Sequence, residues 1–93
     1  MIRIRVSYCA QARAAAGVAS DDIELDGART PADLLTKAVF ARGEKLRRVL
    51  LDENARPHPS VLVFANGKQL SLTSTQPLLE GDEVEIVPPI SGG

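Results

Sequence analysis

The chain has 93 residues, 44% of them hydrophobic, which fits one small globular domain and not a disordered segment. Aromatic residues make up only 3%, and eleven basic residues oppose twelve acidic ones, so neither base stacking nor a strong positive field favours nucleic acid as a partner. A single cysteine excludes an internal disulfide and no apolar run approaches membrane-spanning length, so we expect a soluble cytoplasmic protein without a membrane partner.

The first part of the chain is expected to contain two strands. Side chains in residues 2–8 are apolar at even positions and polar at odd positions, which is the period of a strand with one buried face. Residues 10–17 form a connecting segment, whose alanines could make a helical turn that the glycine at its end would stop. Ile23 and Leu25 alternate with acidic residues and predict a second strand within residues 18–26.

A helix is predicted to start at Thr30. Thr30 can cap it, Pro31 suits its first position, and Asp33 favours the positive end of the helix dipole. The apolar side chains that follow fall on one helical face, and Gly43 is a C-terminal stop. A short second helix is indicated over residues 46–50, and a loop with two prolines follows it.

Three more strands are expected in the last third of the chain. A continuous apolar run over residues 61–65 predicts a strand with little exposure. Asn66-Gly67 is a strong hairpin signal and joins this run to a short returning strand at residues 68–70. Residues 83–87 form the last strand. This order of elements predicts an α+β fold in which one principal helix covers one face of a sheet.

The outer face of this sheet can be predicted if the first and last strands are neighbours. Arg3 and Arg5 face away from the apolar side of the first strand, and Glu83 and Glu85 do so in the last. The arginines would then meet the glutamates, and each cross-strand pair contributes roughly 0.2–1 kcal/mol. Such pairs help to set the register of the two strands.

The side chains offer no catalytic constellation. His58, the one histidine, lies between two prolines and reads as a loop residue, and the one cysteine, Cys9, has no base near it in the sequence. One histidine and one cysteine make no zinc site, and no glycine-rich run suits a phosphate. We therefore expect a chain that is not an enzyme by itself and that binds neither a metal nor a cofactor.

The sequence ends with a segment unlike the rest. Pro88 and Pro89 lack the N–H that a strand needs, so we expect residues 1–87 to form the domain and residues 88–93 a flexible diglycine tail. The two final glycines have no Cβ and can pass through a narrow channel. The main-chain carboxylate of Gly93 is then the most accessible reactive group, and a frayed end without a function is the alternative.

Three blocks, spread over nearly the whole chain, carry a resemblance to a known family: residues 8–13 (YCAQAR), 77–84 (PLLEGDEV) and 88–93 (PPISGG). With these blocks in this order, the chain resembles the MoaD/ThiS sulfur-carrier family, and most closely its MoaD branch, the small subunits of molybdopterin synthase. The resemblance implies the ubiquitin-like β-grasp fold. This is a mixed sheet of about five strands, with the first and last strands adjacent and parallel and one main helix packed on one face.

The resemblance also implies a mechanism. A ubiquitin-activating-type adenylating enzyme, MoeB-like, would use ATP to convert the Gly93 carboxylate into an acyl-adenylate, and a sulfur donor protein would displace AMP to leave a thiocarboxylate. A MoaE-like large subunit of molybdopterin synthase would then receive the tail in its active site and transfer the sulfur to a pterin precursor. The tail residues that would thread this site are Pro88, Pro89, Ile90, Ser91 and Gly92.

The end of the outer face next to the tail is the candidate docking surface. There the charged residues give way to Ser7, Cys9 and Val87, and we hypothesise that partners dock at Cys9 and Val87.

Two departures from the family pattern keep other pathways open. Cys9 stands where relatives often have an aromatic residue, and Ala65 stands where valine is usual. The unmatched stretch over residues 42–60 is reminiscent of carriers for cysteine synthesis or transfer-RNA thiolation. A carrier for cysteine, thiamin or tRNA thiouridine synthesis is therefore an alternative. A ubiquitin-like protein modifier and a plain interaction domain are two others.

Overall fold

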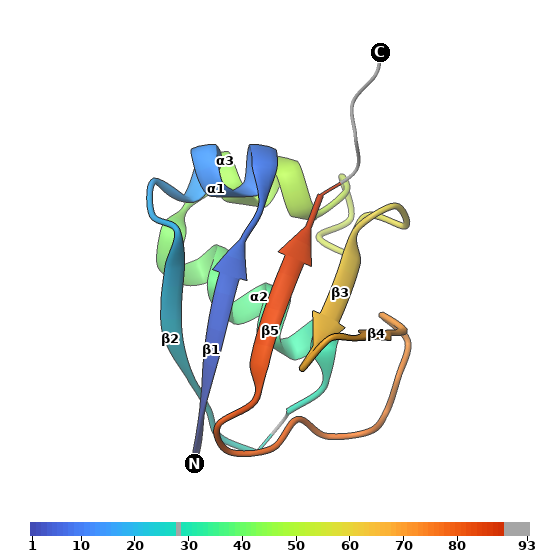
Figure 1. The fold of residues 1–93 in the computed structure, drawn as a ribbon. Helices are drawn as coiled ribbons and strands as arrows, with labels where there is room; N and C mark the ends of the chain where they lie inside the picture. Colours follow the sequence, from blue (N-terminus) through green and yellow to red (C-terminus); the bar gives the residue numbers. More distant parts are fainter. Residues whose placement is uncertain (28, 89–93) are drawn as a thin grey trace.

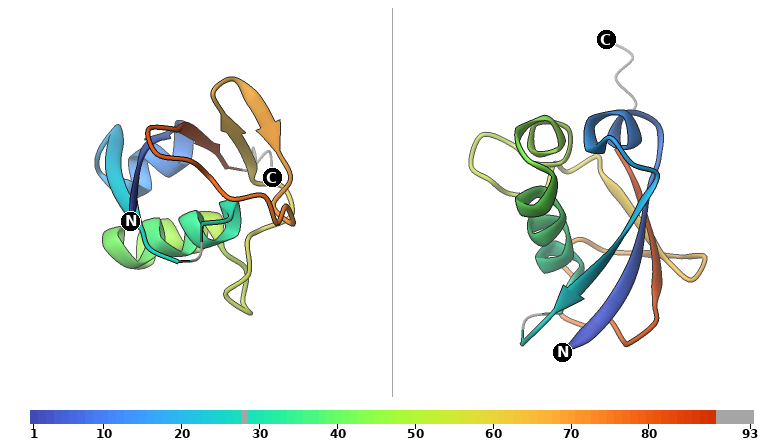
Figure 2. Two further views of the ribbon diagram at one scale, coloured as in Figure 1. Left: turned by 90° about the horizontal axis from the view of Figure 1, so that it is seen from below. Right: turned by 90° about the vertical axis from the view of Figure 1, so that its left-hand side faces the viewer.

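A five-stranded mixed sheet with its helices on one face organises the computed structural model, which describes residues 1–27 and 29–88 (Figures 1 and 2). The strand order is β2-β1-β5-β3-β4, with β1 and β5 parallel and the other neighbours antiparallel. The elements in chain order are β1 (Ile2–Tyr8), α1 (Ala10–Ala16), β2 (Ser20–Leu25), α2 (Pro31–Arg42), α3 (Glu44–Leu50), β3 (Leu62–Ala65), β4 (Lys68–Leu70) and β5 (Glu83–Val87).

The predicted α+β sheet, its parallel first and last strands and the main helix on one face are all confirmed. The alternation of β1 is the cause of this layering, because its even-numbered side chains are buried and most of its odd-numbered ones are exposed. The buried face packs against apolar residues of α2 and α3, among which Leu34, Leu35, Leu46 and Leu50 are fully buried.

Helix α2 begins where the sequence predicts. The Asp33 N–H donates to Thr30 Oγ1 at 3.3 Å, and the Thr30 N–H donates to Asp33 Oδ2 at 3.0 Å, which completes a capping box. The Thr30 hydroxyl also donates to Asp33 Oδ2 at 2.6 Å, and this bond first, followed by the bond from the Thr30 N–H, holds the pKa of the Asp33 carboxyl below its ordinary value. Gly43 ends the helix with a φ of 96°, a backbone conformation that glycine adopts without strain.

The segment over residues 10–17 differs from the prediction. It is a seven-residue helix, α1, and not a connection with at most one helical turn. The Cys9 carbonyl accepts hydrogen bonds from the N–H groups of Ala12 and Arg13, and Gly17 closes the helix in the left-handed conformation, as expected. Buried Ala12 and Ala16 allow this helix to lie close to α3 and to the sheet.

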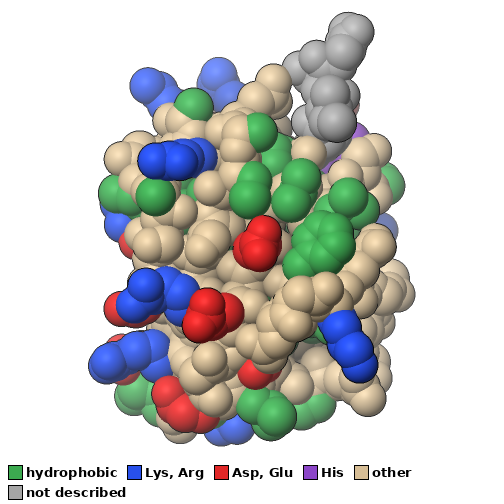
Figure 3. All heavy atoms as spheres, in the orientation of Figure 1, with side chains coloured by type: hydrophobic (Ala, Val, Ile, Leu, Met, Phe, Trp, Pro, Cys, Tyr) green, Lys and Arg blue, Asp and Glu red, His purple; other side chains and the backbone are tan. Residues whose placement is uncertain are grey.

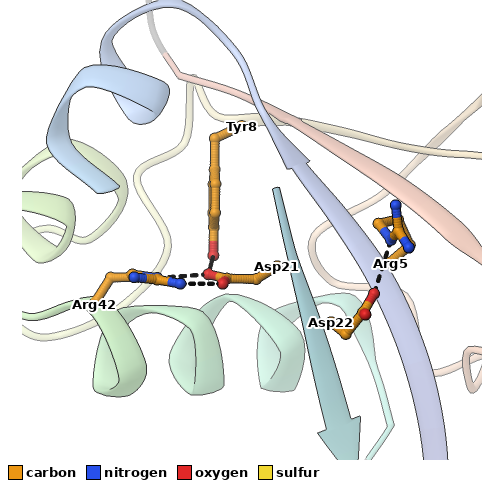
Figure 4. Close-up of polar contacts among 5 residues, drawn as sticks. All are labelled: Arg5, Tyr8, Asp21, Asp22 and Arg42. Carbon is orange, nitrogen blue, oxygen red and sulfur yellow. Dashed lines mark hydrogen bonds and ion pairs between the residues drawn. The ribbon is translucent and has the colours of Figure 1, made fainter. Parts of the chain in front are cut away.

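The predicted pairing of arginines with glutamates on the outer face is wrong. Arg5 does stand opposite Glu83 in the register of β1 and β5, but Glu85 stands opposite Ser7. The guanidinium of Arg5 instead pairs with Asp22 of β2 at 2.7 Å, and Arg3 pairs with Glu24 of β2 at 3.6 Å (side chain of Arg5 in Figure 4). Both arginines therefore turn toward the antiparallel neighbour, which offers acidic groups directly across the strand pair.

Candidate functional site

The candidate site lies at the end of the sheet where β1 and β5 finish. Because these two strands are parallel, their carboxyl ends meet at the same end of the sheet, where β5 finishes at Val87, directly before Pro88. Pro88, the first tail residue, is buried. The remaining residues predicted to form the tail and the reactive end lie outside the described part of the chain: Pro89, Ile90, Ser91, Gly92 and Gly93.

The two predicted docking residues come together at this edge. The Cys9 N–H donates to the Ile86 carbonyl at 3.1 Å, which extends the pairing of β1 with β5 by one step and sets Cys9 beside Val87. Both side chains are half-buried, and the thiol of Cys9 is free. They border the same outer surface, which places them where partners could reach both at once.

Strand β3 adds two hydrophobic residues that the sequence interpretation missed. Leu62 stands opposite Val87 and is 39% exposed, while Phe64 stands opposite Glu85 and is half-buried. The prediction that residues 61–65 form a strand with little exposure is therefore wrong, since only alternate side chains enter the core. The predicted fold could have revealed these two residues. When helices cover only one face of a sheet, the outward-facing side chains of a strand inside the sheet stay uncovered.

We call Ser7, Cys9, Leu62, Phe64 and Val87 the sheet patch. Figure 3 shows hydrophobic side chains gathered on this half of the outer face, with an acidic side chain among them, and most of the charged side chains of this face on the other half. The apolar surface continues past Leu62 into an open hollow of about 540 Å³. The apolar residues that line the hollow are Pro57, Pro59, Val61, Leu62, Leu70 and Leu72. An exposed surface rich in apolar side chains is typical of protein–protein interaction sites.

A polar cluster on the opposite side of the sheet fixes the end of β1 (Figure 4). The Tyr8 hydroxyl donates to Asp21 Oδ2 at 2.8 Å, and Arg42 Nε donates to the same oxygen at 2.7 Å. The Nη2 of Arg42 donates to the other carboxylate oxygen, Oδ1. The hydrogen bonds from Arg42 are the main cause of the lowered pKa of Asp21, and burial followed by the Asp21 contact raises the pKa of Tyr8. The cluster joins β1, β2 and the last turn of α2 just behind the sheet patch.

His58 is held by hydrogen bonds in the loop that follows α3. The Nδ1 of His58 accepts a hydrogen bond from the Ser60 N–H at 3.3 Å, and the backbone N–H of His58 donates to the Leu50 carbonyl at 2.8 Å. These bonds hold the loop after α3. Within residues 1–27 and 29–88, no cluster of three or more histidine, cysteine or acidic side chains could hold a metal ion. No helix in the same residues is long and apolar enough to cross a membrane.

Comparison with known proteins identifies the family. The model of the ThiS family matches residues 6–93. The chain belongs to the ThiS family. It is a ubiquitin-like sulfur carrier, as the resemblance of its sequence to the MoaD/ThiS carriers predicted.

Relatives of this ThiS-family chain point to carriers and to modifiers. The molybdopterin synthase sulfur carrier subunit of Chlamydomonas reinhardtii is 35% identical over 100 residues, covering 99% of this chain and 100% of that protein. SAMP1 of Haloferax volcanii superposes with a TM-score of 0.84 at 25% identity, over 98% of this chain and 99% of that one. The small archaeal modifier protein 1 of Methanosarcina acetivorans has a TM-score of 0.78 at 25% identity, over 100% of this chain and 98% of that one.

Proposed function

We propose that this carrier transports sulfur as a thiocarboxylate on Gly93, and that it serves molybdopterin synthesis as the small subunit of molybdopterin synthase. The observation that carries the proposal is the full-length likeness to a molybdopterin synthase sulfur carrier subunit at 35% identity. The match to the ThiS family extends through Gly93, so the diglycine segment belongs to the shared pattern.

The chemistry requires activation by a partner. A carboxylate is a poor electrophile until one of its oxygens becomes a good leaving group. An activating enzyme provides this when the Gly93 carboxylate attacks the α-phosphate of ATP, which releases pyrophosphate and forms an acyl-adenylate. A sulfur donor protein then delivers sulfur at the sulfide level; this sulfur attacks the acyl carbon, the carbon–oxygen bond to AMP breaks, and a thiocarboxylate remains. The thiocarboxylate is ionised at neutral pH and, like a thiolate, is a soft nucleophile.

The carrier itself supplies reach and docking in this scheme, and its partners supply catalysis. The sheet patch is the proposed contact surface for the activating enzyme and for the large subunit of molybdopterin synthase. Leu62 and Val87 stand on neighbouring strands at the edge where the tail begins. A partner that covers them is therefore also positioned to receive residues 88–93 in its active site.

A second candidate function is protein modification, in which Gly93 would form an isopeptide bond with a lysine of a target. The likeness to small archaeal modifier protein 1 favours this possibility specifically. Carriers for cysteine, thiamin or tRNA thiouridine synthesis share the first steps of the proposed chemistry and differ only in the acceptor of the sulfur.

The test is incubation with the cognate activating enzyme, ATP and a sulfur source, followed by intact-mass measurement. Exchange of one oxygen atom for one sulfur atom is the expected result, and the chain with one extra residue after Gly93 is the control that should not change. Covalent ladders on other proteins would instead identify a modifier. An unchanged mass with every activating enzyme would contradict both readings. Co-purification with a large catalytic subunit would assign the pathway.

A further inference from the structure

Glu85 places one carboxylate in the middle of the apolar half of the outer face. It lies on β5, the central strand of the sheet, and its cross-strand neighbours on the two sides are Ser7 and Phe64. Val87 follows on the same face of the strand. Figure 3 shows an acidic side chain bordered by hydrophobic ones on this half of the face. A partner that covers the sheet patch must therefore also cover Glu85.

The cations of this face do not neutralise Glu85. Arg5 is paired with Asp22 and Arg3 with Glu24, both on the far side of β1. Among the residues that the structure describes, the exposed Glu85 carboxylate has no ion pair and no side-chain hydrogen bond. In the free carrier, water solvates it.

Docking changes this situation. Covering an ionised carboxylate with an apolar surface removes its water and is strongly unfavourable unless a partner group replaces that water. Glu85 cannot avoid being covered by turning to a sheet edge, since two strands lie on one side of β5 and two on the other.

From this arrangement we infer that the activating enzyme presents a cationic side chain, best an arginine, within an otherwise apolar surface, and that this cation pairs with Glu85. This inference rests on the proposed function and adds a determinant of partner choice to it. Arginine fits best because its guanidinium can bind the carboxylate through two hydrogen bonds and lie against the neighbouring ring of Phe64. A carboxylate at this position also rejects activating enzymes that present only apolar or acidic groups there.

The test measures affinity for the activating enzyme with Glu85→Gln and, as a matched control, Glu83→Gln. Both residues are exposed on the same face of β5, but Glu83 lies at the charged end, opposite Arg5. We expect Glu85→Gln to raise Kd about tenfold or more and to flatten the dependence of Kd on salt, and Glu83→Gln to change Kd by less than about threefold. Equal or tighter binding of Glu85→Gln would overturn the inference, because it would mean that the carboxylate opposes docking or is not covered.

A second readout separates this inference from the proposed function. At saturating activating enzyme, the parent and both variants should all gain one sulfur by intact mass, since Glu85 affects docking and not the chemistry at Gly93. If the parent and Glu85→Gln gain sulfur and bind equally well, the inference fails and the proposed function stands. If the parent gains no sulfur with any activating enzyme, the proposed function fails and this inference falls with it.

Discussion

Replacing Tyr8 with phenylalanine tests how firmly the end of β1 is held behind the sheet patch. Tyr8 is only 3% exposed, and its hydroxyl donates to the Asp21 carboxylate at 2.8 Å. A hydrogen bond to a charged group contributes about 1.5–3 kcal/mol to stability. Because Arg42 still satisfies the carboxylate in the variant, we expect a loss near the lower end of this range, about 1.5–2 kcal/mol. For a domain of this size that loss lowers Tm by roughly 6–16 °C.

Urea unfolding across pH is the assay, and the direction of each effect follows from the pKa shifts. Asp21 has a pKa below its ordinary 3.8, so its contribution to stability is present above that value and is lost as pH falls through the lower folded-state pKa. Tyr8→Phe removes one hydrogen bond that lowers the Asp21 pKa, so the folded-state pKa moves back toward 3.8 and the variant should lose less stability in acid than the parent does. Tyr8 has a pKa raised above 10.0, so the parent should lose stability above pH 10 and its advantage over the variant should shrink there.

Asp22→Asn is the matched control, because Asp22 is the next residue of β2 and lies on the opposite face of the sheet. Its ion pair with Arg5 is about half exposed, at 58% for Arg5 and 51% for Asp22. Exposed pairs contribute no more than about 1 kcal/mol, so this variant should keep most of its stability. An equal loss in the two variants, or a Tm unchanged by Tyr8→Phe, would refute the role assigned to the Tyr8 cluster.

Three further predictions concern the helix cap, the docking surface and the tail. Thr30→Ala removes the capping box of α2 and should lower the free energy of unfolding by about 1 kcal/mol, as measured by chemical denaturation. Thr36→Ala, at an exposed position of the same helix, is the control. Val87→Glu should weaken binding to the activating enzyme about tenfold or more when Kd is measured by calorimetry, while Tm stays close to that of the parent. Equal affinity of the variant and the parent would contradict docking at the sheet patch. One extra residue after Gly93 should abolish sulfur loading but leave that affinity within about threefold, because docking and chemistry use different parts of the chain.

The sequence predicts most of the fold because its local signals agree with one another. The structure confirms the positions of the elements that three of these signals predict. They are the alternation of β1, the Thr30 cap with Asp33 at the start of α2, and the Asn66-Gly67 turn between β3 and β4. Helix α1 was expected to be at most one helical turn, because its sequence, AQARAAA, has little contrast between apolar and polar faces. The packing of Ala12 and Ala16 against neighbouring elements supports this helix. A local sequence pattern does not show such tertiary contacts.

The candidate site was predicted in part, and its missing part depends on tertiary geometry. Cys9 and Val87 could be placed on one surface because each lies at the end of an alternating strand. Leu62 and Phe64 were not assigned to it, since a continuous apolar run does not tell which of its side chains face outward. Likewise, the choice of Arg5 between Glu83 and Asp22 depends on the reach and direction of its side chain, and not on which strands are neighbours.

The position of the transferred sulfur within the chain decides whether Gly93 is the carrier group. After incubation with the activating enzyme, ATP and a sulfur source, the carrier would be fragmented in a mass spectrometer to find the residue that bears the added sulfur. We expect the mass change to be confined to Gly93 and to correspond to exchange of one oxygen for sulfur. Sulfur found on Cys9 as a persulfide, with Gly93 unchanged, would contradict it.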